Sequence, residues 1–273
     1  GWGAPEVYFA GCYADWTGLW TSRGFADDPW APFRFDSGFE YPILIAVVAS
    51  ILAWLAHAIS AGAESLGIDV GANVVFYDLN FLAVVALWML VTVVVAKLAS
   101  IRYWDAAMVA VAPGIIFAGF INWDMWAVAF MVTAMWAFAK HRYVLAGVLI
   151  GLGAAVKLFP LFLLGAIIVL AIRSGRYYPL VITAAGAGIA WLTVNLPLMV
   201  FNPDAWAVFY EYSSTREPGW SSIWHAYTTA TGADISGDQL SGGHSGPSLP
   251  HARSSPSSDS RPAADHAWRN SCS

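Results

Sequence analysis

The chain has 273 residues, of which 58% are hydrophobic and only 11% are charged, with a formal net charge of −5. A soluble domain usually carries about 25% charged residues, so this composition indicates a membrane protein and excludes an ordinary soluble enzyme. The net negative charge argues against a nucleic-acid partner. Two cysteines, Cys12 and Cys272, are too few for a disulfide framework.

Residues 1–40 are polar and aromatic, rich in glycine and proline, and too irregular for a membrane span. We expect them to form an extracytoplasmic loop with short helices. The chain begins with glycine rather than methionine, so we also expect that upstream sequence, including a first membrane helix, is missing.

The region 41–201 contains about seven apolar segments and is predicted to be the membrane region of a multi-pass protein of the cell membrane. Because a helix needs roughly 20 residues to cross a bilayer, several segments are short for independent spans. We expect short helices around a polar cavity, in an all-α, polytopic fold. The segments are 41–60, 74–99, 106–121, 125–139, 144–156, 158–172 and 179–201.

Two further regions follow the apolar segments. Residues 202–231 are predicted to form an extracytoplasmic aromatic loop. Residues 232–273 are rich in serine and proline and have almost no aliphatic side chains. Such a segment cannot bury a core, so it is predicted to be disordered.

Basic residues cluster between the apolar segments, and two crossings separate each cluster from the next if 144–156 and 158–172 are separate helices. All three clusters then lie on one side, which the positive-inside rule assigns to the cytoplasm. The stretch 122–124 and Lys157 fall on the exterior side. The clusters are Lys97 with Arg102, residues 140–142, and Arg173 with Arg176.

The side on which 1–40 lies depends on 41–60. If both 41–60 and 74–99 cross the membrane, the loop lies inside; if 41–60 is a shallow re-entrant segment, the loop lies outside with Lys157. Pro42, His57 and the polar stretch after them make 41–60 a weak span. We therefore favour the re-entrant arrangement.

Lys157 lies within an apolar run, "GVLIGLGAAVKLFPLFLLGAIIVLAI", and is followed by Pro160. A lysine at bilayer depth is costly unless it reaches the interface or lines a wet site. A helical hairpin would place Lys157 at its tip. The lysine then either snorkels to the interface or holds an anionic group such as phosphate, and the sequence leaves both interpretations open.

Four other residues in the loops are candidates for a site. Asn122 and Asp124 either cap the helix that follows them or face a substrate. Asp15 lies in "GCYADWTGLW" and Glu40 in "FDSGFEYP". Each is either an ordinary solvated carboxylate or part of an aromatic-walled cleft, in which an aspartate suits a general base.

The stretch 209–227, "FYEYSSTREPGWSSIWHAY", mixes aromatic residues with Arg216 and His225. It is either an interfacial aromatic belt or a surface that binds sugar and phosphate. The sequence contains no P-loop, no nucleophile-elbow motif and no metal-ligand cluster, so no metal and no cofactor are predicted.

Several blocks together resemble one family, in order along residues 8–227. They include "CYADWTGLW", "FEYPILIAV", "FINWD", "AGVLIGLGAAVKLFPLFLL" and "VNLPLMVFNPDAWAVFYEYSS". They are similar to actinobacterial membrane proteins of glycosyltransferase family 87, the polyprenol-phosphate-mannose-dependent α-mannosyltransferases. The resemblance implies a helical bundle of GT-C type, present here in part.

The resemblance also implies a function on the extracytoplasmic face. It predicts transfer of a hexose, expected to be mannose, from a polyprenyl-phosphate sugar to a glycan or glycolipid acceptor. Asp15 best matches the family's catalytic aspartate, and Lys157 is expected near the donor phosphate. The remaining candidates for substrate binding are Asn122, Asp124, Glu40, Arg216 and His225.

Two alternatives stay open at this point. The family continues with further helices where this chain turns Ser/Pro-rich, which suggests a truncated or frameshifted chain and an inactive fragment. Broken helices with intramembrane lysine and aspartate also suit a transporter or lipid flippase, although the sequence shows no repeated halves.

Overall fold

The computed structural model describes residues 13–34, 38–215 and 222–232. Within these ranges every regular element is a helix, which confirms the all-α prediction. The predicted disordered tail lies outside the described residues, apart from Gly232. The helices are α2 (Asp15–Ser22), η1 (Ala31–Phe33), α3 (Ile43–Ser65), α4 (Ala72–Ala99), η2 (Ser100–Ala106), α5 (Ala107–Ala110), α6 (Pro113–Ala118), α7 (Asp124–Ala139), α8 (Tyr143–Val156), η3 (Phe159–Leu161), α9 (Phe162–Ser174), α10 (Tyr178–Phe201), α11 (Pro203–Thr215) and α12 (Ile223–Thr231).

In the described part of the chain, three helical stretches are long and apolar enough to cross a membrane: Ile43–Ser65, Ala72–Ala110 and Tyr178–Phe201. Helices α7 and α8 and the stretch Phe159–Ser174 are apolar but shorter. The 28 residues of α4 measure roughly 42 Å at 1.5 Å per residue, more than the hydrocarbon thickness of a bilayer. Long and short apolar helices therefore coexist, as the segment lengths predict.

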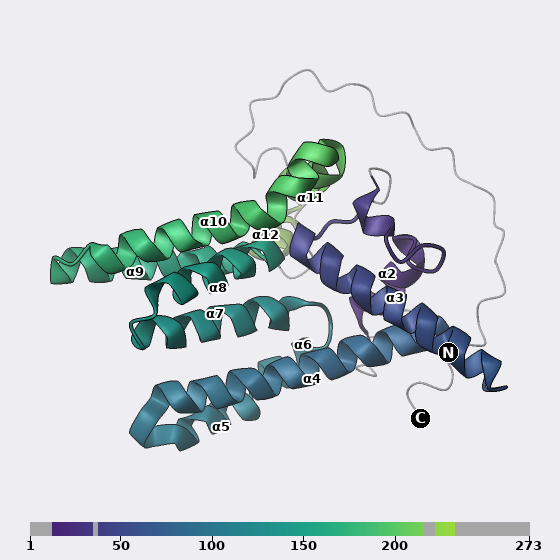
Figure 1. The fold of residues 1–273 in the computed structure, drawn as a ribbon, viewed down its shortest axis with the longest axis horizontal. Helices are drawn as coiled ribbons and strands as arrows, with labels where there is room; N and C mark the ends of the chain where they lie inside the picture. The colour runs from purple at the N-terminus through teal and green to yellow at the C-terminus, as the bar shows by residue number, and fades with distance from the viewer. Residues whose placement is uncertain (1–12, 35–37, 216–221, 233–273) are drawn as a thin grey trace.

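Helices α4, α7, α8, α9 and α10 run roughly side by side (Figure 1), and α8 packs against both α7 and α10. Small residues set the distance between α8 and α10. A Cβ atom added to Gly147 would collide with the carbonyl oxygen of Thr183, and one added to Gly151 would collide with that of Ala187. This G-x-x-x-G spacing allows two helix backbones to approach closely.

The connections that carry the basic clusters lie at one end of this bundle. In Figure 1 the turns after α4, between α7 and α8, and between α9 and α10 are all at the left-hand end. The turns before α7 and after α8 lie toward the other end. The hairpin prediction is confirmed, since α8 and α9 are separate helices and Lys157 lies between them.

Helix α3 differs from the prediction for 41–60. It is one continuous helix of 23 residues and passes through His57 without a break. The ring of His57 stacks on Trp20, with centroids 5.1 Å apart, and its Nε2–H donates to the carbonyl oxygen of Phe25 at 2.8 Å. The helix is long and apolar enough for a span, and the first loop satisfies the polar side chain that made it look weak. Whether it crosses or re-enters the membrane stays a prediction. The membrane side of residues 1–40 stays a prediction.

The apolar segment predicted at 106–121 is not one helix. It is divided among the end of η2, α5 and α6, and Ala112 has an extended backbone between α5 and α6. Pro113 explains this break, because a proline disfavours helical geometry in the residue before it.

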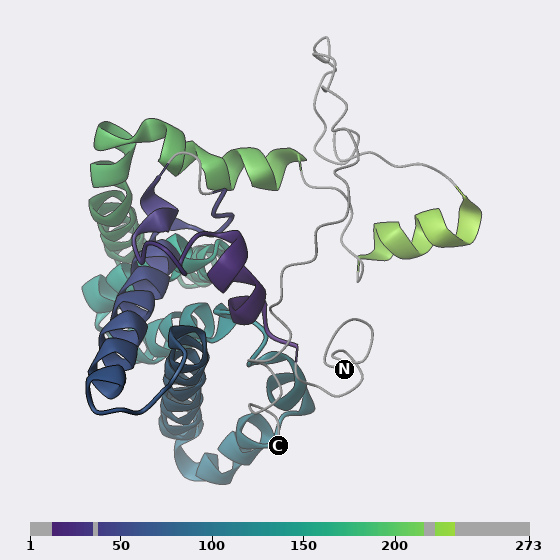
Figure 2. The same ribbon diagram turned by 90° about the vertical axis from the view of Figure 1, so that its right-hand side faces the viewer.

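The described part of the first loop packs into the core rather than lying free. Trp16 and Phe25 are fully buried, and Phe25 and Trp20 both contact Phe76 of α4, with centroids 5.5 and 5.0 Å apart. Figure 2 shows α2 beside α3, with α11 crossing above them. The loop is therefore held firmly enough to position side chains at the end of the bundle.

Candidate active site

A cavity of about 660 Å³ lies at the end of the bundle opposite the basic clusters. Its wall is built from α2, residues 40–42, the turns before α7 and after α8, and α11. Four residues predicted from the sequence line it: Asp15, Glu40, Asn122 and Lys157. Segments up to 200 residues apart in the chain thus form one polar chamber.

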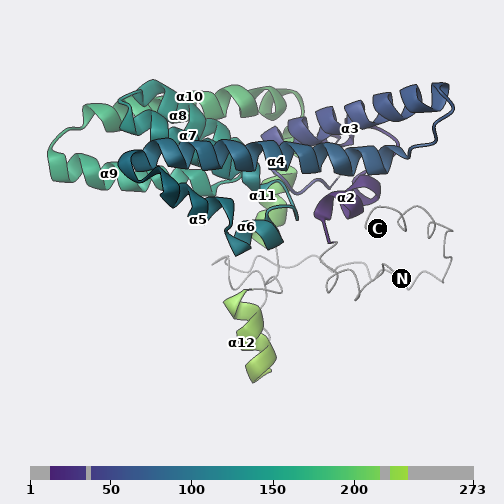
Figure 3. The same ribbon diagram turned by 90° about the horizontal axis from the view of Figure 1, so that it is seen from below.

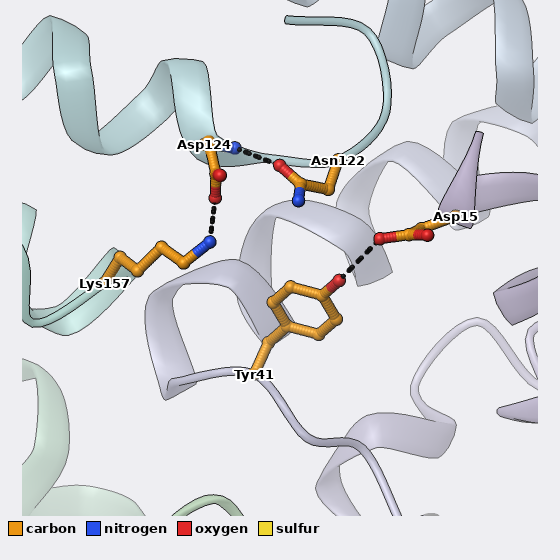
Figure 4. A network of polar contacts seen from close by, with 5 residues as sticks. All are labelled: Asp15, Tyr41, Asn122, Asp124 and Lys157. Atoms are coloured by element: carbon orange, nitrogen blue, oxygen red, sulfur yellow. Dashed lines mark hydrogen bonds and ion pairs between the residues drawn. The ribbon is translucent and has the colours of Figure 1, made fainter. Parts of the chain in front are cut away.

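Asp15 is held by two contacts at the first position of α2. Its backbone N–H donates to the carbonyl oxygen of Ile121 at 2.8 Å, which joins the first loop to the turn before α7. Its Oδ2 accepts a hydrogen bond from the hydroxyl of Tyr41 at 3.2 Å (Figure 4). Both the backbone and the carboxylate are therefore fixed in place.

Tyr41 packs in a cluster with two other aromatic rings. Its centroid is 5.4 Å from that of Phe39 and 5.1 Å from that of Trp123. Burial, followed by the nearby carboxylates of Asp15 and Glu40, raises the pKa of Tyr41 above its ordinary value of about 10. The phenol therefore stays protonated and keeps donating to Asp15.

Glu40 lines the cavity, but its charge is paired. Arg23 Nε lies 2.7 Å from Glu40 Oε2, and the two side chains are only about a quarter and a fifth exposed. The hydrogen bond to Glu40 raises the pKa of Arg23 above its usual value. The carboxylate of Glu40 is therefore held by a guanidinium rather than left free to face a substrate in the cavity.

Asn122 and Asp124 both lie at the turn that leads into α7, where the sequence left capping and facing a substrate open. Asn122 Oδ1 accepts a hydrogen bond from the backbone N–H of Asp124 at 2.9 Å, a local turn contact just before α7, whose N-cap residue, Trp123, makes no side-chain capping bond. Asn122 also lines the cavity, and the carboxylate of Asp124 pairs with the ammonium of Lys157. The turn therefore faces the site, and the Asn122 contact holds the backbone of Asp124 in place.

Lys157 is presented by the end of α8. The helix stops at Val156, and Lys157 has an extended backbone before the turn that leads to Pro160. The side chains of Lys157 and Asp124 are 40% and 44% exposed, so a ligand in the cavity can reach the ion pair. An ammonium has three N–H donors, so the bond to Asp124 leaves two for an anion.

A buried polar contact anchors the turn that carries Asn122 and Asp124. Trp123 between them is 1% exposed, and its Nε1–H donates to Asn80 Oδ1 of α4 at 2.7 Å. Asn80 in turn donates through Nδ2 to the carbonyl oxygen of Phe76 at 2.8 Å. The turn is thereby tied to the longest helix of the bundle.

The structure brings together five of the seven predicted site residues: Asp15, Glu40, Asn122, Asp124 and Lys157. His225 lies on α12, which stands apart from the bundle in Figure 3, and it is not among the residues that line the cavity. A role for His225 in substrate binding therefore stays a prediction that this cavity does not support. Arg216 lies outside the described residues.

Sequence reasoning missed several residues of the chamber. Tyr41 follows Glu40 directly in "FEYP", and that adjacency was the available signal. Phe209 and Tyr212 of α11 belong to the aromatic stretch already noted, but nothing local predicts that α11 faces α2. Within the described ranges no group of three or more metal-ligating side chains forms a metal site.

The three carboxylates at the chamber thus differ in their partners. In the described part of the chain, Glu40 pairs with Arg23 and Asp124 with Lys157, whereas Asp15 accepts a hydrogen bond from the neutral phenol of Tyr41. This arrangement provides one carboxylate without a cation and, separately, one accessible cation. It suits proton removal at one place and binding of an anion at another.

An all-α bundle with membrane-length helices and this polar chamber defines a membrane protein with a site at one end. The model of glycosyltransferase family 87 matches residues 39–240, more than half of the chain. The chain therefore belongs to glycosyltransferase family 87 and is a membrane glycosyltransferase. No curated protein and no solved structure matches it. The matched range includes Lys157, but Asp15 lies before it.

Proposed function

We propose that this protein transfers a hexosyl group, expected to be mannose, from polyprenyl phosphate to a hydroxyl of a glycan or glycolipid on the extracytoplasmic face. The observation that carries the proposal is the pairing pattern at the chamber: Asp15 has no cation among the described residues, while Lys157 is exposed to the same cavity. A base and an anion-binding group are the two functions that such a transfer needs.

The reaction is a single displacement with inversion at the anomeric carbon. The acceptor oxygen forms a bond to that carbon while the bond from carbon to the phosphate oxygen breaks. The electron pair of the broken bond stays on the phosphate, and the acceptor's proton passes to Asp15. A phosphate leaves without prior protonation, so one carboxylate is sufficient, whereas a glycosidase uses two facing carboxyl groups.

Lys157 is assigned to the phosphate of the donor. Negative charge grows on that phosphate as the sugar departs, and a cation fixed beside it stabilises the transition state. Asp124 holds the lysine by its carboxylate, and Asn122 holds the backbone of Asp124. The lysine is thus positioned before the donor arrives, which reduces the cost of reorganisation.

The proposal is tested by the choice of donor. Membranes that contain the chain are supplied separately with labelled polyprenyl-phosphate mannose, polyprenyl-phosphate glucose and a nucleotide-linked mannose, together with mannoside and glycolipid acceptors. We expect transfer from the polyprenyl mannose donor and none from the nucleotide sugar. Transfer from the nucleotide sugar alone would refute the lipid-linked donor, and preference for glucose would refute only the choice of sugar.

A further inference from the structure

Helix α2 has two faces with different surroundings. Trp16 and Trp20 are buried in the core, and Leu19 is buried at the boundary, where it also lines the cavity. Asp15 and Gly18 are three residues apart, and both line the cavity together with Ser22. Residues three or four apart lie on the same side of a helix, so the candidate base shares its face with a glycine and a hydroxyl.

Helix α11 supplies another part of the cavity wall. Phe209, Tyr212 and Ser213 line the cavity at a spacing of three and four residues, which also places them on one helix face. Tyr212 is 40% exposed. Aromatic rings offer flat apolar surfaces, and hydroxyl groups both donate and accept hydrogen bonds. These are the groups that fit a sugar ring, which has apolar C–H faces and a rim of hydroxyls.

Among the described atoms, no close packing contact requires a glycine at position 18. A Cβ atom added there would meet nothing within 4 Å, and its φ lies outside the left-handed region. Glycine within a helix lowers helix stability relative to alanine, so the backbone does not benefit from it. Its effect is to leave space one turn after Asp15, on the side that faces the cavity.

We propose that the faces of α2 and α11 form the subsite for a saccharide acceptor, and that Gly18 keeps this subsite open beside Asp15. The inference rests on the proposed function, because it places the acceptor where its hydroxyl reaches the candidate base. Asp15 and Lys157 approach from opposite sides, with Tyr41 and Asn122 between them (Figure 4). The acceptor and the donor phosphate therefore occupy different ends of the chamber.

The test fills the space at Gly18 with a side chain. Gly18→Leu is compared with Gly165→Leu, because a Cβ atom at Gly165 of α9 also meets nothing within 4 Å and that residue does not line the cavity. Two rates are measured: transfer to a mannoside acceptor, and hydrolysis of the polyprenyl-phosphate sugar, in which water is the acceptor.

We expect Gly18→Leu to raise the KM for the mannoside by about tenfold or more, because a leucine excludes a sugar ring from the subsite. Hydrolysis needs no space for a second sugar and should therefore fall much less than transfer does. Gly165→Leu should match the parent in both rates. A parental KM for the mannoside in Gly18→Leu would overturn the proposal, as would equal loss of hydrolysis and transfer in a protein that elutes as folded.

A binding measurement separates this inference from the proposed function. Saturation-transfer NMR with α-linked mannotriose needs no turnover of donor. We expect the sugar to bind the parent and Gly165→Leu but not Gly18→Leu. Equal binding by all three would overturn the acceptor subsite, even if the donor assay succeeds. Absence of donor turnover in the parent, with this binding pattern intact, would instead count against the proposed donor.

Discussion

Tyr41 shows how contacts between loops complete the site at the scale of single residues. The sequence indicates Asp15 as a possible base, but its hydrogen-bond partner lies 26 residues later, and packing on Phe39 and Trp123 fixes that partner. The partner of Glu40 lies 17 residues earlier, at Arg23. Pairings of this kind depend on how the loop folds, so the residue types were predictable and the pairs were not.

The raised pKa of Tyr41 predicts a pH dependence of stability. The unfolded tyrosine ionises near pH 10, whereas the folded one resists ionisation because of burial and the nearby carboxylates. The stabilising contribution is therefore complete below about pH 10 and is lost as the pH rises above that value. Thermal midpoints in detergent from pH 8 to 11 should fall more steeply above pH 10 for the parent than for Tyr41→Phe. Parallel curves for the two proteins would contradict the assignment.

Lys157 is the residue for which the sequence left two interpretations, and its ion pair with Asp124 makes them testable. If the ammonium binds the donor phosphate, Lys157→Ala should raise the KM for polyprenyl-phosphate mannose by about tenfold or more, because a hydrogen bond to a charged group is lost. Lys157→Arg keeps the charge and should retain more of the affinity. Initial rates at varied donor concentration give the donor KM of each variant. An unchanged donor KM in Lys157→Ala would favour simple snorkelling.

At the scale of helices, the sequence best predicts helix ends that are set by residues within the segment itself. Lys157 and Pro160 break an apolar run, and the chain turns there. Pro113 breaks another run, and the prediction of a single segment at 106–121 missed that effect. Helix α3 is more regular than the sequence suggests, because His57 looks like a polar defect in the sequence, while in the structure Phe25 accepts its hydrogen bond. That acceptor comes from outside the helix, so no periodicity reveals it.

The packing of α8 on α10 carries a prediction of its own. Gly151→Leu should destabilise the folded protein, because a side chain there would collide with the backbone of Ala187. Gly188→Leu adds the same side chain to α10 at a position where a Cβ atom meets nothing within 4 Å, so it is the matched control. Thermal aggregation in detergent should occur at lower temperature for Gly151→Leu only. Equal aggregation temperatures for the two variants would show that α8 and α10 are not so closely packed.

At the scale of the whole molecule, the basic clusters lie at one end of the bundle and the chamber lies at the other. This arrangement follows from the sequence once the hairpin at Lys157 is recognised. The positive-inside rule then predicts that the chamber opens on the extracytoplasmic side. Asp15 comes from the first loop, Lys157 from the tip of the hairpin, and the cavity joins them. The family fits this layout, because a membrane glycosyltransferase needs both lipid and water within reach of one site.

The central claim is that Asp15 is the base for sugar transfer in this chamber, and one comparison tests it most directly. Transfer from polyprenyl-phosphate mannose is measured in membranes that contain the parent, Asp15→Asn or Asp69→Asn, at matched protein levels. Asp69 is an exposed aspartate that does not line the cavity, so its substitution controls for loss of a charge. We expect Asp15→Asn to lose transfer by about a hundredfold or more and Asp69→Asn to keep the parental rate. Parental transfer by Asp15→Asn would contradict the account.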